Sequence, residues 1–276
     1  MIKVMKKIKV LAVIPARYGS TRLPGKPLSL IGDKTMIQWV YENVKKCELI
    51  DKVIVATDDI RIFNHVKHFG GEVIMTSKRH RSGSDRVAEV AKKIPSEIVV
   101  NVQGDEPLIS RSILYKTITE CLKDKRLQVV TPICKIEYYS ELFDTNFVKV
   151  VVDKNFYALY FSRSVIPFVR DEFVFNQQTF EIKDSEIIKK VNFYRHIGVY
   201  VFRRNFLFKF LSLPPGKLEQ VEKLEQLRIL EHGYKIKTVL VNESPINVDT
   251  EEDLKKVREV IKQRYESSRS KRYKNW

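Results

Sequence analysis

A short basic loop holds the clearest candidates for chemistry in this sequence. The segment IPARYGSTRLPGKPL, residues 14–28, places Arg17, Arg22 and Lys26 directly after an apolar run. Arginine can hold phosphate oxygens in a two-pronged fork, and Gly19 lets the backbone approach a ligand closely. These residue types suit a triphosphate, although a solvated surface loop would have the same composition.

Two common phosphate-binding loops are excluded by spacing. The P-loop requires GxxxxGK followed by Ser or Thr, but five residues separate Gly19 from Gly25, and Pro27 stands where the hydroxyl residue should be. The dinucleotide motif GxGxxG is also absent. The sequence therefore argues against P-loop kinases and nicotinamide-dependent dehydrogenases.

Two aspartates follow apolar runs in different parts of the chain. Asp105 comes after IVVNVQG, and Asp249 comes after VLVNESPINV, just before the last expected helix. Carboxylate oxygen is a preferred ligand of Mg²⁺. Each residue also has an ordinary structural explanation, a turn for Asp105 and a favourable helix dipole for Asp249. Taken alone, neither one identifies a metal site.

Three further polar residues are placed near expected strand and helix ends. Ser82 and Ser84 precede an apolar pattern of helical spacing, so both are candidates for a helix cap. Gln103 follows a buried run and could pair with a nucleotide, but an amide is also common at the end of a strand.

These residues are expected to be positioned by alternating strands and helices. Apolar runs predict strands over residues 9–15, 53–56, 72–75, 98–102 and 128–132. Helical spacing predicts helices over residues 36–47, 60–69, 87–94 and 113–122. Such alternation is typical of βαβ units and a mostly parallel sheet, whose ligands lie at the carboxyl ends of the strands.

The second half of the chain has a different pattern. We expect a hairpin over residues 148–163, an irregular stretch over 171–192, and a strand over 196–202. A helix over 218–231, a strand over 235–241, and a helix over 250–264 capped by Thr250 with Asp253 should follow. The simplest organisation is a single domain over residues 1–265, with a β-rich insertion at about 135–200 and a basic tail over 266–276.

Composition limits the partners and the compartment. A net charge of +16 favours anionic partners such as nucleotides, acidic sugars, nucleic acid or a membrane surface. Nucleic-acid-binding motifs are missing, which makes a basic nucleic-acid-binding protein a poor alternative. No apolar stretch reaches the roughly 18 residues of a spanning helix, so no stable membrane insertion is expected. The three cysteines lack CxxC spacing and are typical of reduced thiols in a cytoplasmic protein.

A succession of segments resembles the sugar-activating nucleotidyltransferases, and most closely the CMP-Kdo synthetases, or 3-deoxy-D-manno-octulosonate cytidylyltransferases. After the loop at 14–28 come, in family order, VIVATDD, SGSDRVAEV, VNVQGDEPLI, YALYFSRSVIP, RHIGVYVFRR, LEQVEKLEQLRILEHGYKIK and VDTEEDL. The resemblance covers about residues 10–260. The CMP-sialic acid synthetases have a related first loop but lack the YFSR and LEQLR segments.

The resemblance implies a fold and a reaction. The fold is α/β, a mostly parallel, Rossmann-like nucleotidyltransferase sheet flanked by helices, with a β-rich inserted lobe. The reaction converts CTP and Kdo into CMP-Kdo and pyrophosphate with Mg²⁺, to activate Kdo for lipopolysaccharide synthesis. Family members are cytoplasmic and usually homodimers. An 8-amino variant of Kdo or another acidic sugar remains an alternative substrate.

The resemblance also implies site residues. The implied catalytic set is Arg17, Arg22, Lys26, Asp105 and Asp249, of which the two aspartates bind the metal. The implied nucleotide-binding set is Ala16, Arg17, Gly19, Arg22, Lys26, Ser82, Gly83, Gln103 and Asp105. The implied sugar-binding set is Arg163, His196, Tyr200, Glu225 and Gln226. Because side chains alternate along a strand, His196 and Tyr200 are expected on one face.

Overall fold

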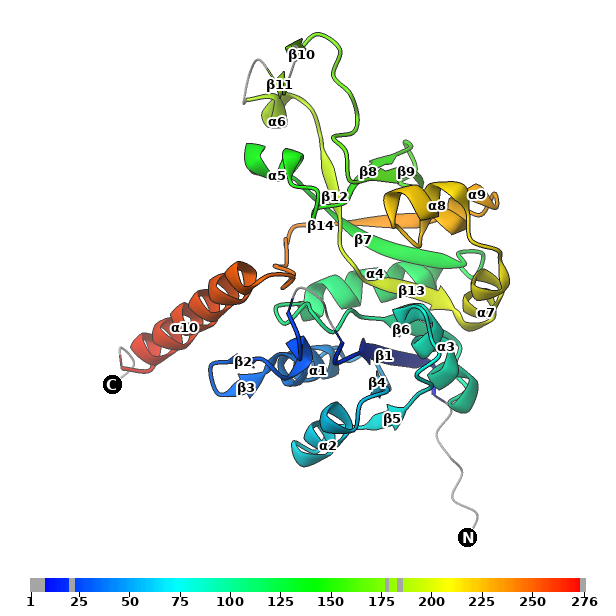
Figure 1. Cartoon of the computed structure of the whole chain (residues 1–276), viewed down its shortest axis with the longest axis vertical. Coiled ribbons are helices and arrows are strands. Elements are labelled where there is room, and N and C mark those ends of the chain that lie inside the picture. Colours follow the sequence, from blue (N-terminus) through cyan, green and yellow to red (C-terminus); the bar gives the residue numbers. More distant parts are fainter. Residues whose placement is uncertain (1–7, 20–22, 177–178, 183–185, 274–276) are drawn as a thin grey trace. The chain divides into compact units, whose positions relative to one another are not determined.

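The computed structural model describes residues 8–19, 23–176, 179–182 and 186–273 of the 276-residue chain (Figure 1). The chain forms two compact units. The first unit comprises the residues up to Tyr115, residues 202–204 and the residues from Pro245 onward. The second unit comprises residues 116–201 and 205–244. The predicted single domain over 1–265 stays a prediction.

Four parallel strands form the sheet of the first unit, in the order β5-β4-β1-β6. Their bounds are β1 (Val10–Ala16), β4 (Lys52–Thr57), β5 (Val73–Met75) and β6 (Ile98–Asn101). β1 lies in the middle, with Leu11 opposite Lys52 of β4 and Val10 opposite Ile98 of β6. Because all four strands run the same way, the loops that follow them leave from one edge of the sheet.

Helices separate these strands, as the sequence predicts. They are α1 (Met36–Lys45), α2 (Ile60–His68) and α3 (Gly83–Lys93). Both α1 and α3 contact β1, whose residues Val10 to Ile14 are all buried. A continuous apolar run buried on both faces is the usual composition of a central parallel strand. The predicted parallel α/β arrangement is therefore confirmed for this unit.

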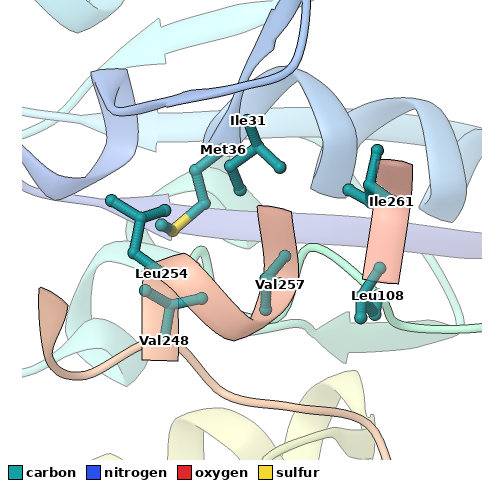
Figure 2. Close-up of a cluster of buried hydrophobic side chains, with 7 residues drawn as sticks. All are labelled: Ile31, Met36, Leu108, Val248, Leu254, Val257 and Ile261. Atoms are coloured by element: carbon teal, nitrogen blue, oxygen red, sulfur yellow. The ribbon is translucent and has the colours of Figure 1, made fainter. Parts of the chain in front are cut away.

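The last helix, α10 (Glu251–Tyr273), is fixed by an apolar cluster (Figure 2). Leu254, Val257 and Ile261 recur at helical spacing and pack with Ile31 and Met36. Burying one such side chain fully stabilises the fold by roughly 1.5–3 kcal/mol. The cluster also includes Leu108 and Val248, so it holds the segment that leads into the helix and carries Asp249.

The two ends of α10 differ in how well they were predicted. The expected cap is confirmed, because the Asp253 amide donates to Thr250 Oγ1 and the Thr250 amide donates to Asp253 Oδ2. The expected end at Arg264 is wrong, since the helix continues to Tyr273. Residues 265–273 contain neither Gly nor Pro, so no residue there breaks the helix.

A mixed sheet forms the centre of the second unit. β7 (Val129–Lys135) pairs in parallel with β14 (Lys237–Val241) and antiparallel with β12 (Tyr194–His196). β12 pairs with β8 (Lys149–Val152), which forms an antiparallel hairpin with β9 (Ala158–Ser162). The predicted hairpin over 148–163 is confirmed. Most strands of this unit lie within the β-rich segment expected from the family resemblance.

The remaining elements are short or have residues in both units. They are β2 (Leu30–Ile31), β3 (Lys34–Thr35), α4 (Arg111–Lys123), α5 (Tyr139–Phe143), β10 (Phe173–Asn176), β11 (Thr179–Ile182), α6 (Ile187–Lys190), β13 (Tyr200–Arg203), α7 (Arg204–Ser212), α8 (Lys217–Glu222) and α9 (Leu227–Glu231). β10 and β11 pair antiparallel, so the irregular stretch expected over 171–192 is wrong. Because this stretch is polar, its hydrophobic pattern did not predict the small two-stranded sheet that β10 and β11 form.

The helix expected over 218–231 is also wrong, because the chain breaks it into α8 and α9. Lys223 adopts a left-handed backbone (φ 56°) that ends α8. The two helices are then tied together by an ion pair of Glu219 with Arg228, whose Nε lies 2.7 Å from Oε2. The Glu231 carboxylate accepts the amide of Leu218 at the start of α8. These local contacts outweigh the helical periodicity of the sequence.

Candidate active site

A cavity of ≈ 390 Å³ lies in the first unit, among the loops that follow β1 and β6. Its volume is within the range of small-molecule sites. The lining residues are Pro15, Ala16, Arg17, Lys26, Pro27, His80, Arg81, Ser82, Gly83, Arg86, Gln103, Gly104, Asp105 and Asp249. The sequence thus predicted most of the residues that the fold brings to this cavity.

Lys26 is aimed by a tight turn. Gly25 has a left-handed backbone (φ 71°) and precedes a short 3₁₀ turn, Lys26–Leu28, in which Pro27 is buried. A side chain at position 25 would also press on the Tyr18 ring, with Cβ 3.1 Å from its nearest atom. Glycine is therefore favoured here by the backbone conformation, and a larger residue would also have to displace the Tyr18 ring.

The ammonium group of Lys26 joins two distant parts of the chain. Nζ lies 2.7 Å from Asp105 Oδ2 and 3.3 Å from Asp249 Oδ1, and it donates to the Val248 carbonyl oxygen at 2.8 Å. All three ammonium hydrogens therefore have an acceptor. The Val248 amide donates to the Asp105 carbonyl oxygen at 3.0 Å, which fixes the two aspartate loops to each other. The result is one cation between two carboxylates.

The loop between β6 and Asp105 packs closely on the end of β1. A Cβ atom at Gly104 would lie 2.9 Å from the Pro15 carbonyl oxygen, closer than such atoms come in proteins. The glycine is therefore needed to let two backbones meet. This close approach brings Asp105 beside β1, and Gly104 itself lines the cavity.

The turn at Ser82 is a complete helix cap. The Ser82 Oγ accepts the Asp85 amide at 3.2 Å, and Asp85 Oδ2 accepts the Ser82 amide at 3.0 Å. The structural explanation for Ser82 therefore holds. It leaves Ser82, Gly83 and Gln103 at the cavity wall, where amide and hydroxyl groups can meet a polar ligand.

Arg86 is a cavity residue that the sequence reasoning missed. Its buried guanidinium donates to Asp58 at 2.6 Å, to Thr76 Oγ1 at 3.0 Å and to the Ser77 carbonyl oxygen at 3.1 Å. It thereby joins the ends of β4 and β5 to α3. The basic stretch KRHRSGSDR around the Ser82 turn was the available signal.

His80 and Arg81 were missed as well. His80 Nε2 lies 2.7 Å from Glu89 Oε2 on α3. Burial would raise the pKa of Glu89, but hydrogen bonds from Lys93, the Ser77 amide and His80 lower that pKa to about 2. An ionised Glu89 therefore holds the imidazole at the cavity wall.

The remaining predicted residues of the basic loop have separate outcomes. Arg17 is exposed and lines the cavity together with Ala16. Gly19 is not among the lining residues. Arg22 lies outside the residues that the structure describes.

The predicted sugar-binding residues lie in the second unit. His196 ends β12 and Tyr200 begins β13, so residues 196–202 do not form the single strand that we predicted. The two rings are nevertheless neighbours, with centroids 5.1 Å apart. A ring pair across two strands replaces the expected pair on one strand face.

The hydrogen bonds of Thr131 fix the tautomer of His196. Thr131 Oγ1 donates its proton to the Val199 carbonyl oxygen at 2.7 Å and lies 2.7 Å from His196 Nε2. Because a hydroxyl has one proton, Nε2 must be the protonated nitrogen and Nδ1 carries the lone pair. Burial, assisted by the neighbouring Arg195, lowers the pKa of His196 to about 3. The imidazole is therefore neutral and offers an acceptor.

Arg163 is held by the backbone at two points. Its Nε donates to the Glu222 carbonyl oxygen at 3.1 Å, and one terminal nitrogen donates to the Thr145 carbonyl oxygen at 2.7 Å. The Glu222 carboxylate accepts Ser162 Oγ at 2.6 Å and the Arg163 amide at 3.1 Å. Glu222 has no counterpart in the sequence predictions, because its partners become neighbours only in the folded unit.

Glu225 and Gln226 lie in the turn between α8 and α9, where Lys223 breaks the helix. Gln226 is buried, whereas Glu225 is partly exposed. They are therefore not the surface of one continuous helix, which was the plain structural alternative.

The donor set at Lys26 fits a hard divalent cation only in part. Among the described residues, no group of three or more His, Cys, Asp and Glu side chains could hold a metal ion. Asp105 and Asp249 provide two carboxylates, which is the usual protein share of a Mg²⁺ site that completes its shell with water and substrate phosphates. The residues present therefore fit Mg²⁺ bound together with a polyphosphate.

Two proteins with similar sequences carry the same enzyme name. Residues 11–236 match the family model described as "Cytidylyltransferase". The chain is 46% identical over 258 residues to the 3-deoxy-manno-octulosonate cytidylyltransferase of Geotalea daltonii, covering 93% of this chain and 100% of that one. It is 46% identical over 257 residues to the enzyme of the same name from Fusobacterium nucleatum, covering 93% and 98%.

Solved structures show the same relationship. A structure named as CMP:2-keto-3-deoxy-manno-octonic acid synthetase complexed with CTP matches with a TM-score of 0.83 and 40% identity, covering 93% of this chain and 99% of that chain. A cytidylyltransferase from Leptospira borgpetersenii matches with a TM-score of 0.58 at 20% identity, which supports the fold alone. In the described part of this chain, every helix is too short or too polar to cross a bilayer.

Proposed function

Because the chain belongs to the 3-deoxy-manno-octulosonate cytidylyltransferase family, we propose that it transfers the cytidylyl group of CTP to Kdo. The products are CMP-Kdo and pyrophosphate. The observation that carries this proposal is the convergence of Lys26, Asp105 and Asp249 on one cavity, in a chain 46% identical over 258 residues to an enzyme of that name.

The reaction is a displacement at the α-phosphorus of CTP. The anomeric hydroxyl oxygen of Kdo forms the new bond to phosphorus, and the bond from that phosphorus to the β-phosphate oxygen breaks. Pyrophosphate leaves with the electron pair, and the hydroxyl proton passes to water. Such a transfer depends mainly on positioning and on stabilising negative charge.

The first-unit cavity suits the nucleotide. Lys26 and Arg17 bring positive charge to the triphosphate, and the Ser82-Gly83 turn with Gln103 offers the backbone and side-chain groups that would distinguish cytosine from uracil. By the family resemblance Arg22 would add a third charge. Arg86 and His80 extend the polar wall beyond the predicted set.

Mg²⁺ is the cofactor we propose, held by Asp105 and Asp249. A bound Mg²⁺ would neutralise charge on the triphosphate and favour departure of pyrophosphate. Lys26 then has two roles, one in the free protein and one in the complex with substrate. It balances the two carboxylates in the free protein and faces phosphate in the complex.

The second unit supplies the groups proposed for the sugar. Arg163 is a fixed cation for the Kdo carboxylate, and neutral His196 offers Nδ1 as an acceptor for a sugar hydroxyl. Tyr200, Glu225 and Gln226 complete the proposed set. A homodimer in the cytoplasm is part of the same proposal, and light scattering of the purified protein tests the dimer.

A panel of acidic sugars tests the substrate. Pyrophosphate release should be measured with CTP and Mg²⁺ for Kdo, 8-amino Kdo and a sialic acid. We expect the highest kcat/KM for Kdo. A clear preference for 8-amino Kdo or sialic acid would replace the sugar while keeping the transfer, and no release with any sugar would refute the proposed function.

A further inference from the structure

A buried lysine in the second unit is unused by the reaction described above. Lys149 belongs to β8 and is 0% exposed. It lies opposite Ser162 in the antiparallel register with β9, one residue before Arg163. The hairpin therefore places a second cation next to the proposed sugar-binding arginine.

Lys149 has no carboxylate partner. Its Nζ donates to the Asp144 carbonyl oxygen at 2.9 Å, and no Asp or Glu within the described ranges lies at ion-pair distance from it. A lysine almost never lies fully buried without an anionic partner, because leaving water costs the charged form a great deal. An apolar side chain would fill this position without that cost in free energy, which indicates that the charge of Lys149 has a function.

The charges around Lys149 come from three segments. Asp144 precedes β8, Arg163 follows β9, and Glu222 ends α8. Burial is the main influence on the pKa of Lys149 and lowers it, as does Arg163, whereas Asp144 and Glu222 raise it; together these effects bring the pKa to about 8. The group is therefore mainly protonated at neutral pH and close to losing its proton.

Lys149 and Arg163 hold consecutive backbone carbonyls. Lys149 Nζ donates a hydrogen bond to the carbonyl oxygen of Asp144, and an Arg163 terminal nitrogen donates one to the carbonyl oxygen of Thr145 at 2.7 Å. Fixing the first carbonyl limits where the second can lie, and the second orients the guanidinium. The Glu222 carboxylate is already engaged by Ser162 and the Arg163 amide, and neither Glu222 nor Asp144 forms an ion pair with Lys149.

We propose that Lys149 is a positioning residue for the acid sugar, which orients Arg163 through the Asp144–Thr145 backbone and supplies a buried positive charge, not held in an ion pair, for the sugar carboxylate. The proposal rests on the proposed function of this chain and deepens it. A buried charge acts on an anion through a medium of low polarity, so its effect exceeds that of a surface lysine.

The test replaces Lys149 by methionine, which keeps the length of the side chain and removes its charge. We expect Lys149→Met to raise the KM for Kdo about tenfold or more, with the KM for CTP unchanged and the Tm equal or higher. Lys154→Met, an exposed lysine at the turn of the same hairpin, is the matched control and should leave both KM values unchanged.

The outcomes separate this inference from the function itself. A Kdo KM that does not change, or a CTP KM that rises equally, overturns the role of Lys149 while wild-type turnover still supports the enzyme. A lower Tm with both KM values unchanged also overturns it, because that is the mark of a structural lysine. No wild-type turnover of Kdo with CTP refutes the proposed function instead.

A measurement on the wild-type protein tests the same inference if the Lys149→Met variant does not fold. The charged form of Lys149 is the one that favours an anion, so the KM for Kdo should rise as the pH increases through about 8, while the KM for CTP stays flat. A Kdo KM that is constant from pH 7 to pH 9 contradicts the proposal.

Discussion

Lys26 and Asp105 are 79 residues apart in the sequence, yet Lys26 Nζ lies 2.7 Å from Asp105 Oδ2. Asp249, which is 223 residues from Lys26, approaches the same ammonium group to 3.3 Å. The basic loop and both aspartates therefore act as one site, and a change in any of them should affect the other two.

Replacing Lys26 should impair the chemical step. Lys26→Met removes a fixed charge that faces the triphosphate, and losing one such contact typically reduces kcat by about 10²–10³-fold. Steady-state kinetics with saturating CTP and Kdo measures the loss. Lys34→Met is the control, because Lys34 pairs with Glu42 at 2.6 Å and does not line the cavity. Nearly normal turnover of Lys26→Met would indicate that the basic loop is a solvated surface loop and does not bind the triphosphate.

The two aspartates should behave as a unit. Asp105→Asn and Asp249→Asn keep the shape of the side chain and remove its charge, so each should raise the Mg²⁺ concentration needed for half-maximal activity. The double variant should lose much less than the product of the single losses, as for groups that serve one step. Magnesium titrations of all three variants measure this. Fully multiplicative losses, or an unchanged magnesium requirement, would contradict the assignment.

His196 should make the protein less stable as the pH falls. Its pKa is lowered from 6.5 to about 3 in the folded protein, so between these values the unfolded chain binds a proton that the native imidazole does not. The stability is therefore present above about pH 6.5 and declines below it. The His196→Gln variant has no imidazole to protonate at this position, so its stability lacks this part of the pH dependence.

Thermal melts of both proteins measure the effect. The Tm of the wild type minus that of His196→Gln should decrease from pH 7 to pH 5. A Tm difference that is constant over this range would show that His196 is not buried in its neutral form.

The end of α10 should be dispensable for activity. Ile261 is the last residue of the helix in the apolar cluster that anchors it, so truncation after Arg264 leaves that cluster intact. We expect kcat and both KM values to stay within about twofold of the full-length protein, a change of less than about 0.5 kcal/mol. A large loss of activity would show that residues 265–276 contribute to the site or to an oligomer.

Local sequence signals predicted the parts of the site that depend on neighbouring residues. The apolar run before Pro15 predicted β1, and the turn residues after it predicted a loop at the carboxyl end of that strand. Asp105 and Asp249 could be proposed as site residues because each follows an apolar run. The resemblance to the family, whose motifs occur in the same order, then assigned both to one metal site. The parallel strand order, which alternation of strands and helices predicts, brings Asp105 to Lys26. Asp249 is brought there by the apolar cluster that includes Val248 and by the hydrogen bond from the Val248 amide to Asp105.

Features that depend on contacts across the sequence could not be predicted. Arg86 pairs with Asp58, Arg163 with the backbone of Glu222, and Lys149 becomes buried only when the β8–β9 hairpin packs. The break at Lys223 has a similar cause, since the helical pattern continues through it and contacts such as the Glu219–Arg228 pair favour two helices. Periodicity describes one element at a time and contains no information about such pairs.

Direct identification of the product is the most decisive measurement. The purified protein should be incubated with Kdo, Mg²⁺ and either CTP or UTP, and the nucleotide sugar should be identified by mass spectrometry while its rate of formation is followed. We predict CMP-Kdo with stoichiometric pyrophosphate from CTP, and a much lower kcat/KM with UTP. No CMP-Kdo from CTP, or equal kcat/KM with the two nucleotides, would contradict the account.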